Sequence, residues 1–272
     1  LDIEMSFVEQ EDILQLTEAL FTRLVDEIGQ HKLLYRPFRR LTWAEAMDRY
    51  GSDKPDLRFE IPLVNLSDLV AESDFQLFRT AVAEGKQVKA ICVPGCAAYT
   101  RRELDELSAL ATKWGAKGLL SIAVRGEEIR SPLTRYMTPA QMQAVLQRLA
   151  AQDGDLIMIV ADTAEVVAET LGHLRVEMAR RLGLLDDNVL AFAWILDFPL
   201  LEWSEEEGRW TAKHHPFTSA REEDVPLLET APGKVRANAY DIVANGYEVG
   251  GGSIRNYRRA DQERMFRVLG IS

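Results

Sequence analysis

Two carboxylates beside a run of glycines are the strongest chemical candidate in the sequence. Asp241 and Glu248 flank the dipeptide Asn245-Gly246, and residues 250–252 are all glycine. Asn-Gly between two β-rich runs predicts a hairpin, because a type I′ turn needs positive φ at both central residues. Side chains alternate along a strand, so we expect Asp241 and Glu248 to be diagonal neighbours on one face, within reach of a shared ion.

The glycine run next to these acids indicates a ligand or a bend. Glycines weaken a strand interior, which is explained by close approach of a ligand to the backbone or by a bulge. Mg²⁺ takes one or two carboxylates plus phosphate oxygens, so the hairpin predicts a nucleotide-phosphate site. The alternative that the residues leave open is a bent edge hairpin with solvated acids. The expected pairs are Ala244 with Tyr247, Val243 with Glu248 and Asp241 with Gly250, over a floor of Gly250, Gly251 and Gly252.

The second candidate is the histidine pair His214-His215, which precedes Pro216. Proline biases the residue before it toward an extended conformation, so we expect the two imidazoles to point in opposite directions. A histidine near neutral pH can donate a hydrogen bond to a carboxylate or a phosphate. The alternative is two half-buried strand histidines. No further His or Cys at a matching spacing supports a metal site.

The elements that position these residues follow the hydrophobic pattern. Residues 1–7 alternate between apolar and polar, which predicts a half-buried strand, and 11–28 carry a helical apolar stripe. Strands are expected at 88–93, 118–124 and 155–162, with helices capped by Thr100 and by Thr138 before Pro139. A longer helix is expected after an Asp162–Glu165 cap, and 189–203 reads as one buried core strand. The predicted fold class is α+β.

Composition narrows the class of protein. The net charge of −11 argues against a protein that coats nucleic acid nonspecifically, although a local basic patch would still permit such a partner. No apolar run is long enough to span a bilayer and no signal peptide opens the sequence, so we expect a soluble, cytoplasmic protein. Cys92 and Cys96 lack a second ligand pair, so we expect two reduced cysteines in or near a strand.

Five motifs together resemble bacterial-type aspartyl-tRNA synthetases along essentially all 272 residues. The resemblance implies a class II antiparallel sheet flanked by helices, formed by residues 1–60 and 186–272. It further implies that 61–185 are a smaller α+β insertion domain, shared with a subunit of tRNA-dependent amidotransferases. The motifs are LDIEMSF, RYGSDKPDLRF, WILDFPLLEW, KHHPFTS and AYDIVANGYEVGGGSIR.

The same resemblance implies a chemistry and roles for single residues. The family activates L-aspartate with Mg-ATP to aspartyl-adenylate and passes the aspartyl group to the 3′ end of tRNA(Asp). Asp241 and Glu248 match the carboxylates that hold Mg²⁺ and ATP, beside Gly250 to Gly252. Arg255 matches the residue that holds the substrate's side-chain carboxylate, His214 a second aspartate contact, and Asp2 the acid that receives the substrate ammonium. No residue is assigned as an acid or base.

Two further expectations come with the resemblance. Strict alternation places Arg255 on the face opposite Glu248, so its family role requires a bulge or twist within residues 250–253. The family's dimer-forming segment, anticodon barrel and ATP-clamping arginines match nothing in these 272 residues, so we expect the isolated segment not to charge tRNA. The alternatives are a noncatalytic synthetase-like protein and an amidotransferase-related tRNA-binding module. The full-length protein is expected to be a homodimer, and charging of tRNA(Asn) stays open.

Overall fold

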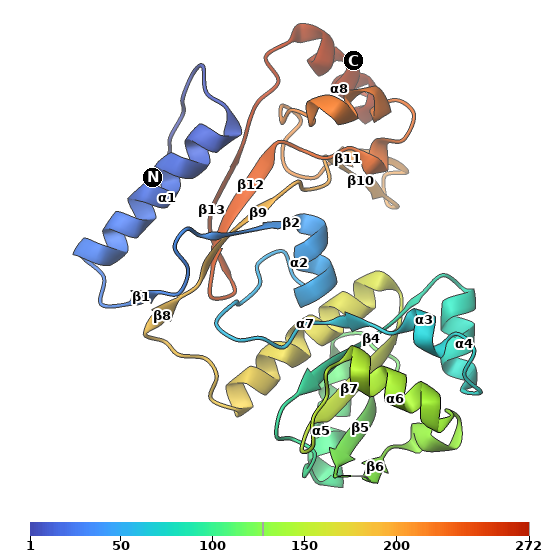
Figure 1. The fold of residues 1–272 in the computed structure, drawn as a ribbon. Helices are drawn as coiled ribbons and strands as arrows, with labels where there is room; N and C mark the ends of the chain where they lie inside the picture. The colour runs from blue at the N-terminus through green and yellow to red at the C-terminus, as the bar shows by residue number, and fades with distance from the viewer. Residues whose placement is uncertain (127, 272) are drawn as a thin grey trace. The chain divides into compact units, whose positions relative to one another are not determined.

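In a computed structural model, which describes residues 1–126 and 128–271, the chain divides into two compact units. Unit 1 contains Leu1–Glu45, Asp53–Arg58 and the residues from Asp186 on; unit 2 contains Ala46–Ser52 and Phe59–Leu185. The second boundary coincides with the one expected from the sequence, whereas residues 46–52 join unit 2. The predicted α+β class is confirmed, with antiparallel sheets flanked by helices (Figure 1).

Unit 1 is built on a four-stranded sheet in the order β13-β12-β9-β2. The first three strands are antiparallel neighbours, and β2 pairs with β9 in parallel. Strand β13 forms the edge of this sheet. The elements are α1 (Gln10–Glu27), β1 (Lys32–Leu33), β2 (Arg39–Thr42), β8 (Val189–Leu190), β9 (Phe192–Leu196), β10 (Leu201–Ser204), β11 (Arg209–Ala212), η2 (Glu222–Leu227), η3 (Pro232–Lys234), β12 (Ala239–Ala244), β13 (Tyr247–Ser253) and α8 (Arg259–Leu269).

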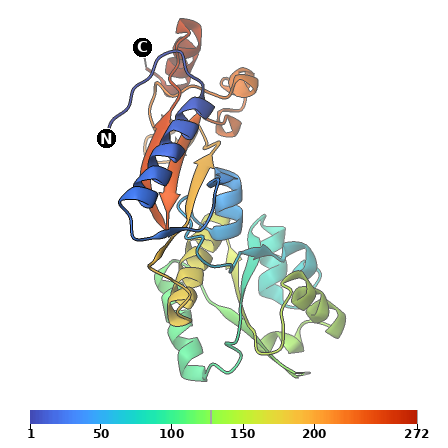
Figure 2. The ribbon, with the colours of Figure 1, turned by 60° about the vertical axis from the view of Figure 1, so that its left-hand side comes forward.

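One face of this sheet is covered by α1. Leu14 packs in one cluster with Trp194 of β9 and with Tyr240 and Ile242 of β12, and Figure 2 shows α1 lying along the sheet. Glu18 of the same helix accepts a hydrogen bond from the Trp194 indole at 3.3 Å. Since side chains alternate along a strand, the odd-numbered neighbours of Tyr240 and Ile242 point to the face away from α1.

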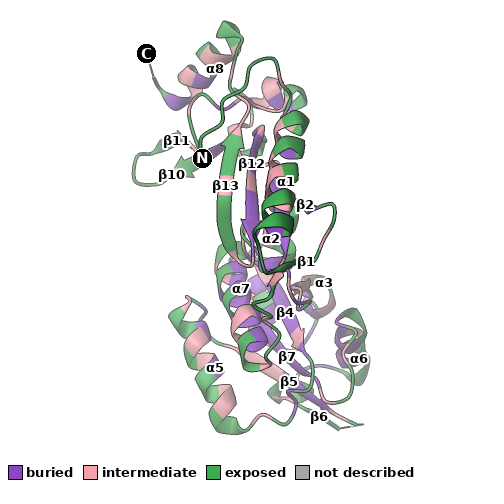
Figure 3. Cartoon of the chain, turned by 90° about the vertical axis from the view of Figure 1, so that its left-hand side faces the viewer, coloured by how far each residue is buried: buried purple, intermediate pink, exposed green. Residues whose placement is uncertain are grey.

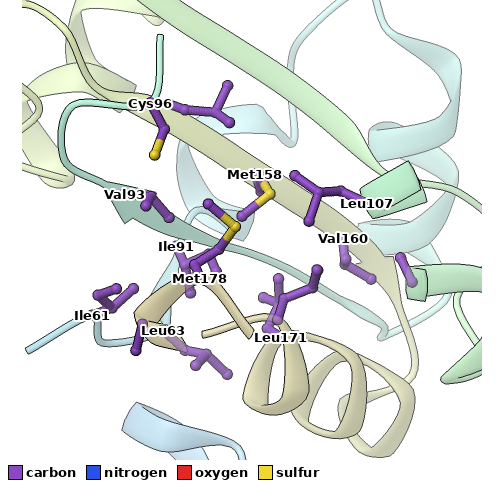
Figure 4. Packing of buried hydrophobic residues seen from close by; sticks show 14 of the residues in the cluster. Ile61, Leu63, Ile91, Val93, Cys96, Leu107, Met158, Val160, Leu171 and Met178 are labelled. Carbon is purple, nitrogen blue, oxygen red and sulfur yellow. The ribbon is translucent and has the colours of Figure 1, made fainter. Parts of the chain in front are cut away.

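Unit 2 is a five-stranded antiparallel sheet in the order β3-β4-β7-β5-β6 with helices packed on it. Its core is apolar, as Figure 4 shows for residues of β4, β7 and α7. The elements are β3 (Val64–Asn65), α3 (Ser67–Val70), α4 (Gln76–Ala83), β4 (Gln87–Val93), α5 (Arg101–Lys113), β5 (Leu120–Arg125), β6 (Glu128–Arg130), η1 (Pro132–Arg135), α6 (Pro139–Arg148), β7 (Leu156–Asp162) and α7 (Ala164–Arg181); α2 (Trp43–Tyr50) spans the boundary between units.

The capping motifs of unit 2 show which local predictions hold. Thr100 and Thr138 cap α5 and α6 as expected, each with its reciprocal partner three residues on. The predicted cap of α7 was one residue early: the Thr163 side chain accepts from the Val166 backbone N–H, while Asp162 accepts from the Thr163 N–H. Both residues are good N-caps, so sequence alone does not choose between them.

The two cysteines lie in unit 2, one at the end of a strand. Cys92 belongs to β4, Cys96 is buried just beyond it, and both are free thiols. Burial, aided by the negative charge of Asp155, raises the pKa of the Cys92 thiol to about 12. A thiol that stays protonated at neutral pH is a poor nucleophile and metal ligand. The prediction of two reduced cysteines near a strand is confirmed.

Two predicted strands of unit 1 were wrong. Residues 1–7 form no strand, and Leu1 and Phe7 are fully exposed, because no described residue pairs with their backbone. The expected strand 189–203 is broken into β8, β9 and β10. Asp197 has φ of 56°, and Pro199 lacks the N–H that a ladder requires, so the chain turns between β9 and β10.

Candidate functional site

The turn of the β12–β13 hairpin forms as the sequence predicts. Asn245 and Gly246 have φ of 52° and 90°, the positive values that a type I′ turn requires. Val243 pairs with Glu248 and Ala244 with Tyr247, as expected. Asn245 does more than turn the chain: its side chain accepts from the Ala191 N–H at 2.9 Å and donates to the Val189 carbonyl at 2.8 Å.

The register beyond Glu248 differs from the prediction. A bulge at Val249 leaves this residue without a partner, so that Ile242 pairs with Gly250 and Asp241 with Gly251 rather than with Gly250. The expected bulge therefore exists, one residue before the glycine run. Because a bulge inserts one residue, it reverses the alternation of the strand after it. Gly251 and Ser253, the odd-numbered positions of β13 after the bulge, thus share a face with Asp241 and Glu248.

The prediction that the three glycines form one floor was wrong. Gly251 faces the acids, whereas Gly250 and Gly252 face the α1 side of the sheet. A Cβ on Gly251 would lie 2.3 Å from the Oδ1 atom of Asp241 and 3.5 Å from the Oε1 atom of Glu248. A Cβ on Gly252 would instead meet the Tyr240 ring at 2.8 Å, and one on Gly250 would meet Ile242. Of the three, Gly251 therefore leaves room for the Asp241 carboxylate, and Gly250 and Gly252 leave room for Ile242 and Tyr240 on the α1 side.

The electrostatics of the acid face favour binding of a cation. Burial raises the pKa of Asp241 from 3.8 to about 7, and the negative charges of Glu248 and Asp53 add to the rise. Lys54 opposes it. A carboxyl whose ionised form is destabilised by burial and by like charges is a natural partner for a cation. No group of three or more His, Cys, Asp or Glu residues suited to a metal occurs among the described residues.

The two histidines of the KHHPFTS motif contact different residues. The His214 ring packs edge-on against Phe198 with centroids 4.8 Å apart. Burial lowers the pKa of His214, and the positive charge of Lys213 adds to this, while the charge of Glu248 opposes it. His215 accepts a hydrogen bond at Nδ1 from the Phe217 N–H. The lowered pKa favours the neutral form of the His214 imidazole, and the charge of Glu248 acts against this shift.

Arg255 and Asp2 lie apart from this acid pair. Arg255 forms an isolated β-bridge with Thr218, and its positive charge opposes the raised pKa of the buried Tyr240 hydroxyl. Asp2 and Arg255 both line a groove of about 1930 Å³ between α1 and the glycine strand. Asp241, Glu248 and His214 do not line this groove. The predicted site residues therefore fall into two sets, both beside the exposed strand β13 (Figure 3).

The sequence reasoning missed the loop of residues 53–58, which it read only as a polar connection. Asp53 and Lys54 act electrostatically on Asp241, and Asp53 also on His214. Asp56 is buried and paired with Arg58, whose side chain is 9% exposed. The available signal was the Asp-Leu-Arg spacing after Pro55, which puts opposite charges two residues apart in a loop.

Comparison with known proteins agrees with these features. Among described residues, no helix is long and apolar enough to cross a membrane. The chain is 53% identical over its whole length to an aspartate–tRNA(Asp/Asn) ligase of Caldanaerobacter subterraneus subsp. tengcongensis and 54% identical to one of Moorella thermoacetica. It is 50% identical to an aspartate–tRNA ligase of Geobacillus kaustophilus. It spans 45–46% of these proteins' own lengths.

The model of one family covers the chain from end to end. Residues 1–272 match the family described as tRNA synthetases class II (D, K and N). The match includes both segments of unit 1, which carry the acid pair and Arg255, and the whole of unit 2. Since the family model and relatives at 50–54% identity cover the whole chain, the protein belongs to the class II tRNA synthetases of this group.

Proposed function

We propose that residues 1–272 are part of an aspartate–tRNA ligase. The enzyme activates L-aspartate with Mg-ATP to aspartyl-adenylate and transfers the aspartyl group to the 3′ end of tRNA(Asp). The observation that carries this proposal is the acid face of the β12–β13 hairpin, where Asp241 and Glu248 meet over Gly251. Two of the relatives are named for both tRNA(Asp) and tRNA(Asn), so tRNA(Asn) is a second candidate acceptor.

Asp241 and Glu248 are the residues that would hold Mg²⁺. Two carboxylates on one face fit Mg²⁺, which takes its remaining ligands from water and from substrate phosphates. The space left by Gly251 supports this assignment, because any side chain there would fill the position next to the Asp241 carboxylate. The bound ion would neutralise charge on the two carboxylates and on the phosphates of ATP.

The residues around the site position the substrates rather than exchange protons with them. The aspartate α-carboxylate attacks the α-phosphate of ATP in line and pyrophosphate leaves, a step that depends on orientation and on charge neutralisation. Gly251 leaves room for the Asp241 carboxylate above the hairpin backbone, and Gly250 and Gly252 leave room for Ile242 and Tyr240 on the other face. Uncharged His214 can donate a hydrogen bond to a carboxylate without adding a full charge.

Arg255 is proposed to bind the side-chain carboxylate of the substrate, with His214 as a second contact. A guanidinium binds a carboxylate through two parallel, charge-assisted hydrogen bonds. The neutral side-chain amide of asparagine has only one acceptor oxygen, so it cannot accept both. Asp2 is proposed to receive the substrate ammonium. Its place in the groove that Arg255 also lines supports this role.

We further propose a cytoplasmic homodimer for the full-length protein. Residues 61–185 are proposed to be the insertion domain shared with a subunit of tRNA-dependent amidotransferases. The chain spans less than half the length of its relatives, so we expect residues 1–272 alone not to charge tRNA(Asp). Measurable charging by this segment would contradict that expectation.

The proposed reaction is tested by ATP–pyrophosphate exchange in a chain of the relatives' full length that carries this segment. We expect exchange that depends on aspartate and on Mg²⁺, with at least about 10⁴-fold discrimination against asparagine, as is usual where a site is built around a polar substrate group. Exchange with neither amino acid would overturn the proposal, and exchange with asparagine at a similar rate would overturn the role of Arg255.

A further inference from the structure

A buried ion pair lies directly beside the turn of the proposed cation-binding hairpin. Asp56 is 4% exposed and receives the Arg58 guanidinium at both carboxylate oxygens, with the shortest contact 2.8 Å, as well as the Arg58 backbone N–H at 3.0 Å. The remaining guanidinium nitrogen donates to the Asp186 carbonyl and to Asp187, each at 3.2 Å. The pair thus ties the loop to the segment that leads into β8.

The loop of residues 53–58 also lies beside the hairpin turn. The Cβ of Asp56 is 3.7 Å from the position that a Cβ on Gly246 would take. Tyr35 donates a hydrogen bond to the Leu57 carbonyl at 3.2 Å. The residues flanking this loop on both sides belong to unit 2, so these contacts are what make 53–58 part of unit 1.

Two charged residues of this loop act on the face of the hairpin that holds Asp241 and Glu248. Asp53 and Lys54 are three and two residues before Asp56, and both act electrostatically on Asp241. Fixing Asp56 against the turn therefore fixes a negative and a positive charge beside the proposed cation ligands. Groups that orient metal ligands from outside the coordination sphere typically change metal affinity about 10–100-fold when they are removed.

We propose that the Asp56–Arg58 ion pair is a positioning device, which holds the 53–58 loop against the hairpin turn and so helps to set the cation affinity of the Asp241–Glu248 pair. This inference rests on the proposed function, because it takes these two acids as the cation ligands. Asp56 and Arg58 act through the loop and the turn and are not themselves ligands.

A second ion pair of the same unit supplies a matched control. Asp224 is 7% exposed and receives the Arg236 guanidinium at both oxygens, and the Arg236 backbone N–H at 3.0 Å. It has the same bidentate geometry as the Asp56–Arg58 pair, but Asp224 lies in η2, outside the 53–58 loop. Any loss of stability from removing a buried carboxylate should therefore appear in both Asp56→Asn and Asp224→Asn.

The experiment measures Mn²⁺ binding by the electron paramagnetic resonance signal of free Mn²⁺, in the full-length chain and without substrates. We expect Asp56→Asn and Arg58→Lys each to weaken binding about tenfold, and Asp224→Asn to leave it within about twofold. Arg58→Lys keeps the positive charge but loses the bidentate contact of the guanidinium with Asp56, so it tests whether that geometry matters. Near-UV circular dichroism confirms that each variant is folded.

The outcomes separate this inference from the proposed function. Wild-type Mn²⁺ affinity in both Asp56→Asn and Arg58→Lys would overturn the positioning role, as would an equal loss in Asp224→Asn. The Mg²⁺ concentration for half-maximal pyrophosphate exchange should rise in Asp56→Asn with little change in the KM for aspartate. If the wild type binds Mn²⁺ and the loop variants weaken it, but no aspartate-dependent exchange occurs, the inference stands and the proposed function fails.

Discussion

Asp241 lies opposite Gly251 across the hairpin, and a Cβ on the glycine would be 2.3 Å from the carboxylate oxygen. This pairing exists because the bulge at Val249 shifts the register by one residue. It explains why the acid face needs a glycine at one position of β13. It also means that the glycines on either side of Gly251 have a different role, beneath Tyr240 and Ile242.

Gly251→Ala is expected to displace the Asp241 carboxylate, because the added methyl would overlap it. Forcing atoms into an occupied position typically costs about 1–3 kcal/mol, so we expect divalent-cation binding to weaken by about tenfold or more. The control is Gly118→Ala, because no heavy atom lies within 4 Å of the position that its methyl group would take and its φ is ordinary. Unchanged Mn²⁺ affinity in Gly251→Ala would contradict the placement of the cation.

The raised pKa of Asp241 predicts a pH-dependent stability in the absence of metal. Because the folded pKa of about 7 lies above the unfolded value, Asp241 contributes stability that is present below about pH 4 and is lost as the pH rises through about 7. Asp241→Asn removes the ionisation, so the melting temperature of the variant relative to that of the wild type should increase as the pH rises from 5 to 8. Thermal melts in chelator at these pH values measure the difference.

Asp224→Asn gives the opposite sign and serves as the control for this titration. Hydrogen bonds from Arg236 hold the pKa of Asp224 below its usual value, so its stabilisation is present at neutral pH and is lost only as the pH falls through that lower pKa. The melting difference between Asp224→Asn and the wild type should be flat from pH 5 to 8. If the melting-temperature difference between Asp241→Asn and the wild type is also constant from pH 5 to 8, the pKa of Asp241 is not raised in the folded protein, and the prediction is wrong.

Arg255→Lys tests recognition of the aspartate side chain. Lysine keeps the positive charge but loses the bidentate fork, and a hydrogen bond to a charged group is worth about 1.5–3 kcal/mol. We therefore expect kcat/KM for aspartate in pyrophosphate exchange to fall about tenfold to a hundredfold, with the KM for ATP little changed. Arg259→Lys, at an exposed position of α8, should leave both values unchanged. An equal effect on the ATP KM would place Arg255 at the nucleotide instead.

Asn245 should contribute to stability in two separable ways. Its positive φ of 52° is tolerated by asparagine and glycine, and its side chain also bonds to the backbone at Val189 and Ala191. Asn245→Gly keeps the turn but leaves these backbone groups unpaired, at a cost of about 1–3 kcal/mol. Asn245→Ala adds backbone strain and should cost more. Equal urea midpoints for the wild type and Asn245→Gly would show that the side-chain bonds contribute nothing.

Local signals account for the parts of the fold that the sequence predicted. The Asn245-Gly246 turn and the Thr100 cap depend on residues within a few positions of one another, and both formed as expected. The resemblance to a family suggested a division of the chain and the role proposed for Arg255, which spacing alone did not reach. The pairing of Val243 with Glu248 followed from the turn because no residue intervenes to shift the register.

The misses depend on contacts between distant residues. Whether the extra residue of the bulge is Val249 or a later glycine is decided by packing on β12, which no local pattern encodes. The break after Leu196 depends on Asp197 adopting positive φ, uncommon for any residue but glycine. The Asp56–Arg58 pair lies beside Gly246 and is bonded to Asp186, and both of these residues are more than a hundred positions away in the chain.

The most direct test of the account is the Mg²⁺ dependence of aspartate-driven pyrophosphate exchange in Glu248→Gln, within a chain of the relatives' length. Glutamine keeps the shape but removes the charge that is proposed to bind the cation opposite Gly251. The account predicts that half-maximal exchange needs at least about tenfold more Mg²⁺ than in the wild type, by analogy with removal of one charged hydrogen-bond partner. An unchanged Mg²⁺ requirement would contradict the assignment of the β12–β13 hairpin as the site of Mg-ATP.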